Sequence, residues 1–176
     1  MACVSDPREA QRERDLRELF VARGEFATAF AGVEDGALGY RDGSGYALSG
    51  IVVHITATID HYRRVLEGMI GTSFKAFAVQ PQDPGVEAAH AKRVQEGFPA
   101  GERDEAFALL ESAHDDLATA ALSLVPADYV RNVPVTYKPG EAPHDTSPSD
   151  IVRWLTTHYR EHIAQIIGMS AATPKR

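Results

Sequence analysis

The chain has 176 residues, 44% of them hydrophobic and 24% charged, and a formal net charge of -7 at pH 7. This composition predicts one globular domain, residues 1–176, and the acidic charge argues against a nucleic-acid partner, because proteins that bind a phosphate backbone usually carry a basic patch. No apolar run approaches the length of a membrane span, the charged N-terminus has no signal core, and the single cysteine, Cys3, excludes an internal disulfide, so we expect a cytoplasmic protein with no membrane partner.

The first predicted helix covers residues 7–31 and carries an apolar stripe. Ser5 or Asp6 caps its start, and Pro7 fits the first turn, where the missing N–H of proline costs nothing. The stripe consists of Leu16, Leu19, Phe20, Phe26, Ala27 and Phe30.

The second predicted helix covers residues 50–67, with Ser49 as its cap and Gly68 as its stop. Its opening, GIVVHITATI, is rich in β-branched residues and also fits a strand. A helix is favoured because apolar residues recur at steps of three and four well beyond the length of a strand. These residues are Ile51, Ile55, Ile59, Tyr62, Val65, Leu66 and Met69.

The third predicted helix covers residues 103–124, and Pro126 marks its end. About thirty residues separate it from the second helix, and a short extra helix is expected there at residues 84–95. So long a link lets the chain cross the bundle before the third helix starts. It therefore permits parallel neighbours, unlike a simple up-down-up-down bundle.

The fourth predicted helix covers residues 148–167 and has the clearest start in the chain. In SPSD, Ser147 is the cap, Pro148 takes the first position, and Asp150 stands where the acid of a capping box reaches back. Gly168 marks the end of this helix. The segment YVRNVPVTY that precedes it is extended in character, which predicts a short strand or hairpin.

Two histidines interrupt the apolar face of the fourth helix. In THYREHI, His158 and His162 are four residues apart, so they lie one above the other, in the same stripe as Ile151, Leu155 and Ile166. Burying either ring without a partner would cost roughly 1–3 kcal/mol. Either the rings are core histidines bonded to carbonyls or carboxylates, or they are two ligands of one metal ion.

His54 is the predicted third ligand. It lies beside the apolar stripe of the second helix, about 7 Å from its start, and His162 lies about 9 Å from the end of the fourth helix. If these helices run antiparallel with level ends, His54 meets His158 and His162 at one height. If they run parallel, it misses them by a turn or more. His61, seven residues after His54, is the main alternative for the third ligand.

Three imidazoles would leave one or more positions of a metal ion open for water or substrate, whereas structural zinc is normally closed by four protein ligands. Imidazole suits Zn²⁺, Ni²⁺, Cu²⁺ and Fe²⁺. A bound ion would lower the pKa of coordinated water or activate a thiol as its thiolate. Asp60, Glu161, Tyr62 and Tyr159 are candidate outer partners of the rings. For Asp60 and Glu161 we favour a solvated helix face.

The remaining histidines, His90, His114 and His144, are predicted to be exposed, because the first two lie in charged helical segments and the third in a loop. Trp154 is expected to lie in the core or in the wall of a pocket. The sequence shows no phosphate loop, no paired-cysteine metal site and no convincing serine triad.

The order and placement of these motifs resemble the DinB-like/YfiT-like superfamily. A histidine early in the second helix, in VVHITATIDHYRRVLEG, is followed far downstream by HYREH in the last helix, and the resemblance covers most of the chain. It implies an all-α four-helix bundle with up-down-down-up topology and a long crossover between helices two and three. It also implies a divalent metal ion (zinc, nickel or iron) held by three histidines, here His54, His158 and His162. Where relatives often have an additional histidine, this chain has Ala57.

The resemblance further implies a homodimer, since members of the family are often dimers. It also implies a small-molecule substrate, since relatives include enzymes that use a low-molecular-weight thiol such as mycothiol, bacillithiol or glutathione. Three hypotheses for function follow. The first is a metal-dependent thiol S-transferase or hydrolase. The second is a non-catalytic metal-binding protein of stress response or metal handling. The third is a structural bundle whose histidines are satisfied by hydrogen bonds in the core.

Overall fold

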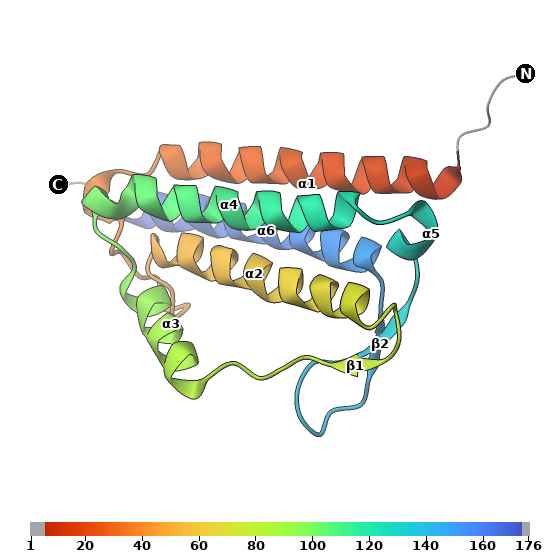
Figure 1. Cartoon of the computed structure of the whole chain (residues 1–176). Helices are drawn as coiled ribbons and strands as arrows, with labels where there is room; N and C mark the ends of the chain where they lie inside the picture. The colour runs from red at the N-terminus through yellow and green to blue at the C-terminus, as the bar shows by residue number, and fades with distance from the viewer. Residues whose placement is uncertain (1–5, 174–176) are drawn as a thin grey trace, which may run out of the picture.

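Four long helices form a bundle in the computed structural model of the chain, which describes residues 6–173. They are α1 (Pro7–Ala31), α2 (Gly50–Gly71), α4 (Arg103–Leu122) and α6 (Pro148–Ala172) (Figure 1). α1 and α6 run in one direction, and α2 and α4 run in the other. The predicted all-α class and up-down-down-up topology are therefore confirmed.

A long crossover joins α2 to α4 and makes these two helices parallel neighbours. It contains β1 (Phe77–Ala78), α3 (Pro84–Glu96) and the 3₁₀ turn η2 (Ala100–Glu102). In Figure 1 it passes below α2 and returns the chain to the end where α2 begins. The expected short helix at residues 84–95 is confirmed as α3, which Asp83 caps through hydrogen bonds to backbone N–H groups.

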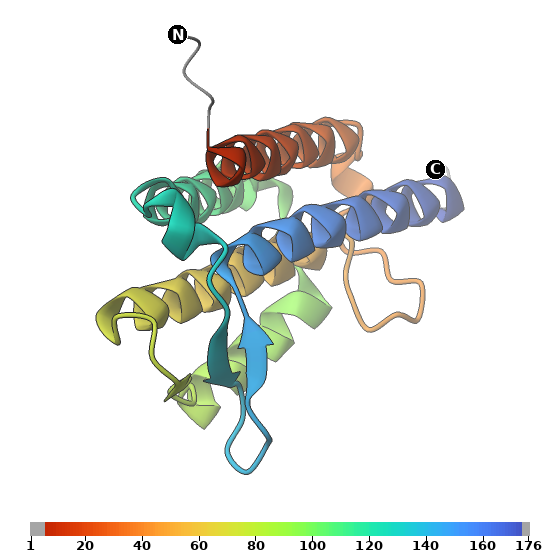
Figure 2. The same ribbon diagram turned by 90° about the vertical axis from the view of Figure 1, so that its right-hand side faces the viewer.

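The link from α4 to α6 contains the extended segment that the sequence predicts. After α5 (Pro126–Tyr129), β2 (Val133–Thr136) and β3 (His144–Thr146) form a hairpin. β2 also pairs with β1 in parallel, which gives a three-stranded sheet of order β1-β2-β3. This hairpin, α3 and the loop of residues 38–49 all project from the side of the bundle formed by α2 and α6 (Figure 2).

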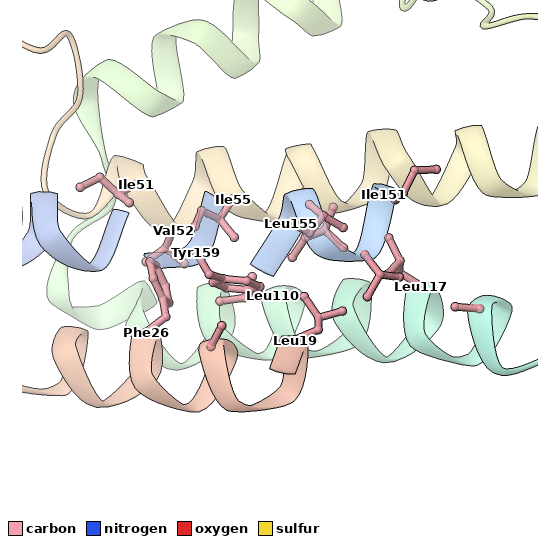
Figure 3. Packing of buried hydrophobic residues seen from close by; sticks show 14 of the residues in the cluster. Leu19, Phe26, Ile51, Val52, Ile55, Leu110, Leu117, Ile151, Leu155 and Tyr159 are labelled. Carbon is pink, nitrogen blue, oxygen red and sulfur yellow. The ribbon is translucent and has the colours of Figure 1, made fainter. Parts of the chain in front are cut away.

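The core fills the space between the four long helices. α1 packs along α6, and α2 packs along α4. Figure 3 shows how residues from all four helices meet; those labelled are Leu19, Phe26, Ile51, Val52, Ile55, Leu110, Leu117, Ile151, Leu155 and Tyr159. Within residues 6–173 no helix is both long and apolar enough to cross a membrane.

Three predicted helix ends differ from the structure. α2 continues past Gly68 to Gly71, α6 continues past Gly168 to Ala172, and α4 ends at Leu122. Gly68 is not a stop; a Cβ there would lie 2.5 Å from the ring of Phe77, so the glycine lets β1 pack closely on α2. The start of α6 is as predicted, with a complete capping box between Ser147 and Asp150. Asp6 caps α1, whereas the alternative cap, Ser5, lies outside the described residues.

The start of α2 is held by contacts that the sequence did not reveal. The Ser49 side chain makes no capping bond to α2. Its hydroxyl donates to the carbonyl of Leu38 (3.0 Å) and accepts the N–H of Phe98 (2.8 Å). A Cβ at the next residue, Gly50, would lie 1.8 Å from the carbonyl oxygen of Val94 at the end of α3. The chain before α2 and the end of α3 are thus fixed against the first turn of α2.

His114 lies in the core, and the prediction that it is exposed is wrong. It is 1% exposed, between the Phe20 ring of α1 (centroids 4.9 Å apart) and the Tyr159 hydroxyl of α6, 3.5 Å from its Nδ1. Its Nε2 has no hydrogen-bond partner. Burial, reinforced by the guanidinium of Arg23, lowers the pKa of His114 to about 4, so the ring is neutral at pH 7.

Gly50→Ala should destabilise the protein by about 2 kcal/mol, because the new methyl group forces the backbone at the end of α3 away from α2. Gly24→Ala is the matched control, since a Cβ at that position inside α1 meets nothing within 4 Å. It should stabilise the protein by about 0.5–1 kcal/mol, the usual difference between alanine and glycine in a helix. Urea unfolding measures both changes; equal effects would contradict the close contact at Gly50.

His114→Leu should make the stability of the protein less sensitive to acid. The unfolded ring takes up a proton below about pH 6.5, whereas the folded ring resists it down to about pH 4. Stability from the neutral ring is therefore complete above pH 6.5 and is lost progressively between pH 6.5 and 4. Between pH 7 and pH 4.5, wild type should lose about 2 kcal/mol more than the variant in urea unfolding. Equal losses would refute this burial.

Candidate metal centre

Three imidazole rings from two helices meet on the side of the bundle formed by α2 and α6. His54 Nε2 of α2 lies 3.1 Å from His158 Nε2 of α6. The ring of His162, one turn further along α6, has its centroid 5.1 Å from that of His54 and 4.5 Å from that of His158. One ring nitrogen from each histidine lies within 4.8 Å of the others. The antiparallel course of α2 and α6 brings the three residues to one height.

The spacing of these nitrogens fits a divalent metal ion. Two imidazole nitrogens bound to one tetrahedral zinc are about 3.3 Å apart, given a Zn–N distance of about 2.0–2.1 Å. The His54–His158 separation of 3.1 Å is close to this value. Bringing the widest separation, at most 4.8 Å, to the same value needs a movement of about 1.5 Å, within the reach of side-chain rotation. Three nitrogen ligands leave coordination open for a further ligand.

Two side chains on α6 orient the rings from outside. Gln165 Oε1 accepts a hydrogen bond from His162 Nδ1 (2.7 Å), and Glu161 Oε2 lies 3.5 Å from His158 Nδ1. With the proton held on Nδ1, each ring turns the lone pair of Nε2 toward the cluster, as metal-binding histidines require. Gln165 also donates to Ser44 Oγ (3.0 Å), which ties the 38–49 loop to this site.

Gln165 is the residue that the sequence reasoning missed. A signal was present, because an acceptor stands three residues after each histidine of α6: Glu161 after His158 and Gln165 after His162. Residues three apart on a helix are neighbours, so each acceptor can reach the outer nitrogen of its ring. Glu161 is exposed, as expected for a solvated face, yet it also faces His158.

The three rings are neutral at pH 7. Burial, and next the nearby rings of His162 and His158, lower the pKa of His54 to about 4. Burial also lowers the pKa values of His158 and His162, with Glu161 opposing the shift at His158 and Gln165 opposing it at His162. Neutral imidazole is the form that binds a metal ion, so an ion would not have to displace protons from this cluster near pH 7.

Aromatic rings flank the cluster at both ends. Trp154, one turn before His158 on α6, stacks on its ring with centroids 4.7 Å apart and an interplanar angle of 16°. Tyr46, from the 38–49 loop, meets His54 edge-on at 5.1 Å and His162 at 5.8 Å. Trp154 is 44% exposed, so it lies outside the core, at the surface beside the cluster.

The other candidates take different places. His61, the alternative third ligand, packs against Tyr62 (5.1 Å) and is outside the cluster. Asp60 forms an ion pair with Arg63, and Tyr159 points into the core toward His114. Neither is therefore an outer partner of the three rings.

The remaining histidines lie away from the three-ring cluster. His144 is exposed, as predicted, whereas His90 of α3 is half-buried. His90 lines a cavity of about 530 Å³ between α2, α3 and α4, and none of the three clustered histidines lines this cavity.

The fold and the facing imidazoles define a four-helix-bundle protein with a three-histidine candidate metal centre between α2 and α6. The chain belongs to the DinB superfamily, whose family profile matches residues 18–166. Among solved structures it is similar to YfiT from Bacillus subtilis, described as a probable metal-dependent hydrolase with an unusual four-helix bundle topology. The two share 17% identity and a TM-score of 0.70 over 98% of this chain and 91% of YfiT, a likeness that shows the fold. No curated protein matches the chain.

Gln165→Ala should weaken zinc binding about 10- to 100-fold, because the Nδ1 proton of His162 loses its acceptor and the ring its fixed orientation. Gln11→Ala is the matched control: Gln11 also donates its amide to a serine hydroxyl, that of Ser149 (2.9 Å), on the opposite side of α6. Competition with a chromophoric chelator measures both affinities. Equal affinities for the two variants would show that Gln165 does not orient the ligand.

Proposed function

We propose that the chain is a divalent-metal-dependent enzyme in which His54, His158 and His162 hold the ion and leave a position open for a nucleophile. The observation that supports this most is the convergence of three neutral imidazoles whose two α6 members have outward acceptors on Nδ1. Zinc, nickel and iron all suit such a nitrogen donor set. When bound, the ion would lower the pKa of a water molecule or a thiol that coordinates it.

The nucleophile is either water, in a hydrolase, or a low-molecular-weight thiol such as mycothiol, bacillithiol or glutathione, in an S-transferase. The likeness to YfiT, described as a probable metal-dependent hydrolase, supports the first. The second is supported by membership of the DinB superfamily, because the resemblance described from the sequence implies relatives that use such thiols. In both, a small-molecule substrate approaches the same open position, and we propose a cytoplasmic homodimer as the working form.

The residues of this chain have separate tasks in the proposed reaction. His54, His158 and His162 present their lone pairs, while Gln165 and Glu161 hold the protons of the α6 rings on the outer nitrogens. These tautomers keep the inner nitrogens of the two α6 rings directed toward the ion, so that only a small rotation of the side chains is needed to bind it. The Gln165–Ser44 hydrogen bond keeps the 38–49 loop beside the site.

A non-catalytic metal-binding protein has the same three ligands, and a structural bundle would satisfy the rings with hydrogen bonds alone. The direct contact between His54 Nε2 and His158 Nε2 is one such bond. Within residues 6–173 the inner nitrogen of His162 forms no hydrogen bond with the protein, whereas an ion would bind all three rings. This favours a metal centre over a purely structural cluster.

Purified protein should contain about one divalent ion per chain, and His158→Ala should lose it, because two imidazoles bind far more weakly than three. His61→Ala is the matched control, since His61 is a half-buried histidine of α2 outside the cluster. Elemental analysis after dialysis measures the metal content. Full metal content in His158→Ala would contradict the proposed ligand set.

Catalysis is tested on the metal-loaded protein with thiols, electrophiles and hydrolysable esters or amides. An enzyme should give turnover that disappears with chelator and in His158→Ala and persists in His61→Ala. A metal-dependent fall in the pKa of one added thiol identifies the S-transferase. Turnover without added thiol identifies the hydrolase, and silence with all of these substrates supports the non-catalytic alternative.

A further inference from the structure

We propose that the ligand of this centre is a neutral molecule that carries an aromatic or similarly flat apolar group beside its metal-binding atoms, with this group lying on Trp154. The inference rests on the proposed function, because it places the ligand at the open position of the same three-histidine centre. It adds the chemical class of the substrate and names the residue that selects it.

Trp154 is the only tryptophan of the chain, and it does not contribute to the buried core. The side chain is 44% exposed, whereas Tyr129 and Tyr159 are among the fully buried residues. The Trp154 ring nevertheless has a fixed place, stacked on His158 and 4.8 Å from the ring of Tyr62 on α2. A large apolar ring that is held in place and left partly open to solvent beside metal ligands is suited to contact a ligand.

The aromatic surface at this end extends over three elements. The ring of Tyr62 on α2 lies between that of Trp154 on α6 and that of Tyr137, which follows β2. Its centroid is 4.8 Å from that of Trp154 and 6.2 Å from that of Tyr137. At the opposite end of the cluster, Tyr46 contacts both His54 and His162. The three-histidine cluster therefore lies between aromatic rings on two sides, and a flat group bound beside it would gain contact area at little cost in side-chain entropy.

The charges around the centre argue against an anionic substrate with a second acidic group. Within residues 6–173, no lysine or arginine forms a hydrogen bond, ion pair or cation–π contact with the three histidines, Trp154 or Tyr46. The charged side chain that faces the ligands is Glu161, an acid. Phosphate and carboxylate groups are usually bound by arginine or lysine, so a phosphorylated or dicarboxylic ligand finds no partner here besides the ion. Among the thiols of the proposed function, this disfavours glutathione and bacillithiol, which carry carboxylates, and leaves mycothiol, which has none.

The test compares two hydroxamic acids on the zinc-loaded protein. Acetohydroxamic acid and benzohydroxamic acid chelate zinc through the same atoms and differ in a methyl group against a phenyl ring. Isothermal titration calorimetry gives both dissociation constants, and their ratio isolates the contribution of the ring. In wild type, benzohydroxamic acid should bind about three- to tenfold tighter, the usual contribution of one aromatic contact.

Trp154→Ala should bring the ratio of the two dissociation constants close to one, whatever its effect on the affinity for acetohydroxamic acid, while Trp154→Phe should keep most of the preference. Phe20→Ala is the matched control, because Phe20 is a similarly exposed aromatic residue (40%) on α1, away from the centre. The fluorescence of Trp154 gives a second readout: benzohydroxamic acid should change it in wild type, and acetohydroxamic acid should change it much less.

Failure of this inference is distinguishable from failure of the proposed function. If zinc and acetohydroxamic acid bind but the ratio is the same in wild type and Trp154→Ala, the aromatic contact is wrong and the metal centre stands. If the wild-type protein retains no zinc, the metal centre itself is wrong, and the inference about its ligand fails with it.

Discussion

The antiparallel alignment of α2 with α6 is the constraint on which the rest of the site depends. His54 lies one turn into α2, and His158 and His162 lie on either side of the middle of α6, so the three rings meet only where the start of α2 passes the middle of α6. The up-down-down-up course of the chain provides this alignment. The contacts around Gly50 then fix the first turn of α2, and with it the height of His54.

The surroundings of the candidate centre come partly from the helices and partly from the irregular segments of the chain. The bundle supplies the three clustered histidines, the two acceptors on α6 and Trp154, all from rigid helices. The 38–49 loop contributes Tyr46 and Ser44, and the segment after β2 contributes Tyr137. This division is common in proteins, where a rigid scaffold holds reactive groups and loops determine what reaches them.

Local periodicity was sufficient to predict the long helices, and the spacing of His158 and His162 with an antiparallel second helix predicted that His54 would lie beside them. The estimate of depth was less accurate, because α6 continues to Ala172 and its end is not level with the start of α2. Contacts between distant segments were not predictable in this way. His114 stands among charged residues in the sequence, but its neighbours in space, Phe20 and Tyr159, come from two other helices. Gly68 is of a residue type that often ends a helix, but here it lies inside α2 and allows the ring of Phe77 to pack closely against the helix. Both errors arise because a local pattern does not state what packs against a residue.

The contact between His54 and His158 joins residues 104 positions apart, and α1 packs along α6, the last helix. Closing so large a loop is entropically costly, and long-range contacts of this kind slow folding. A chain emerging from the ribosome has no complete cluster until α6 has been synthesised and has docked. An ion bound there would link α2 to α6 only after both helices have docked, so it would be absent from the early stages of folding. It would therefore act mainly by slowing the unfolding of the native protein.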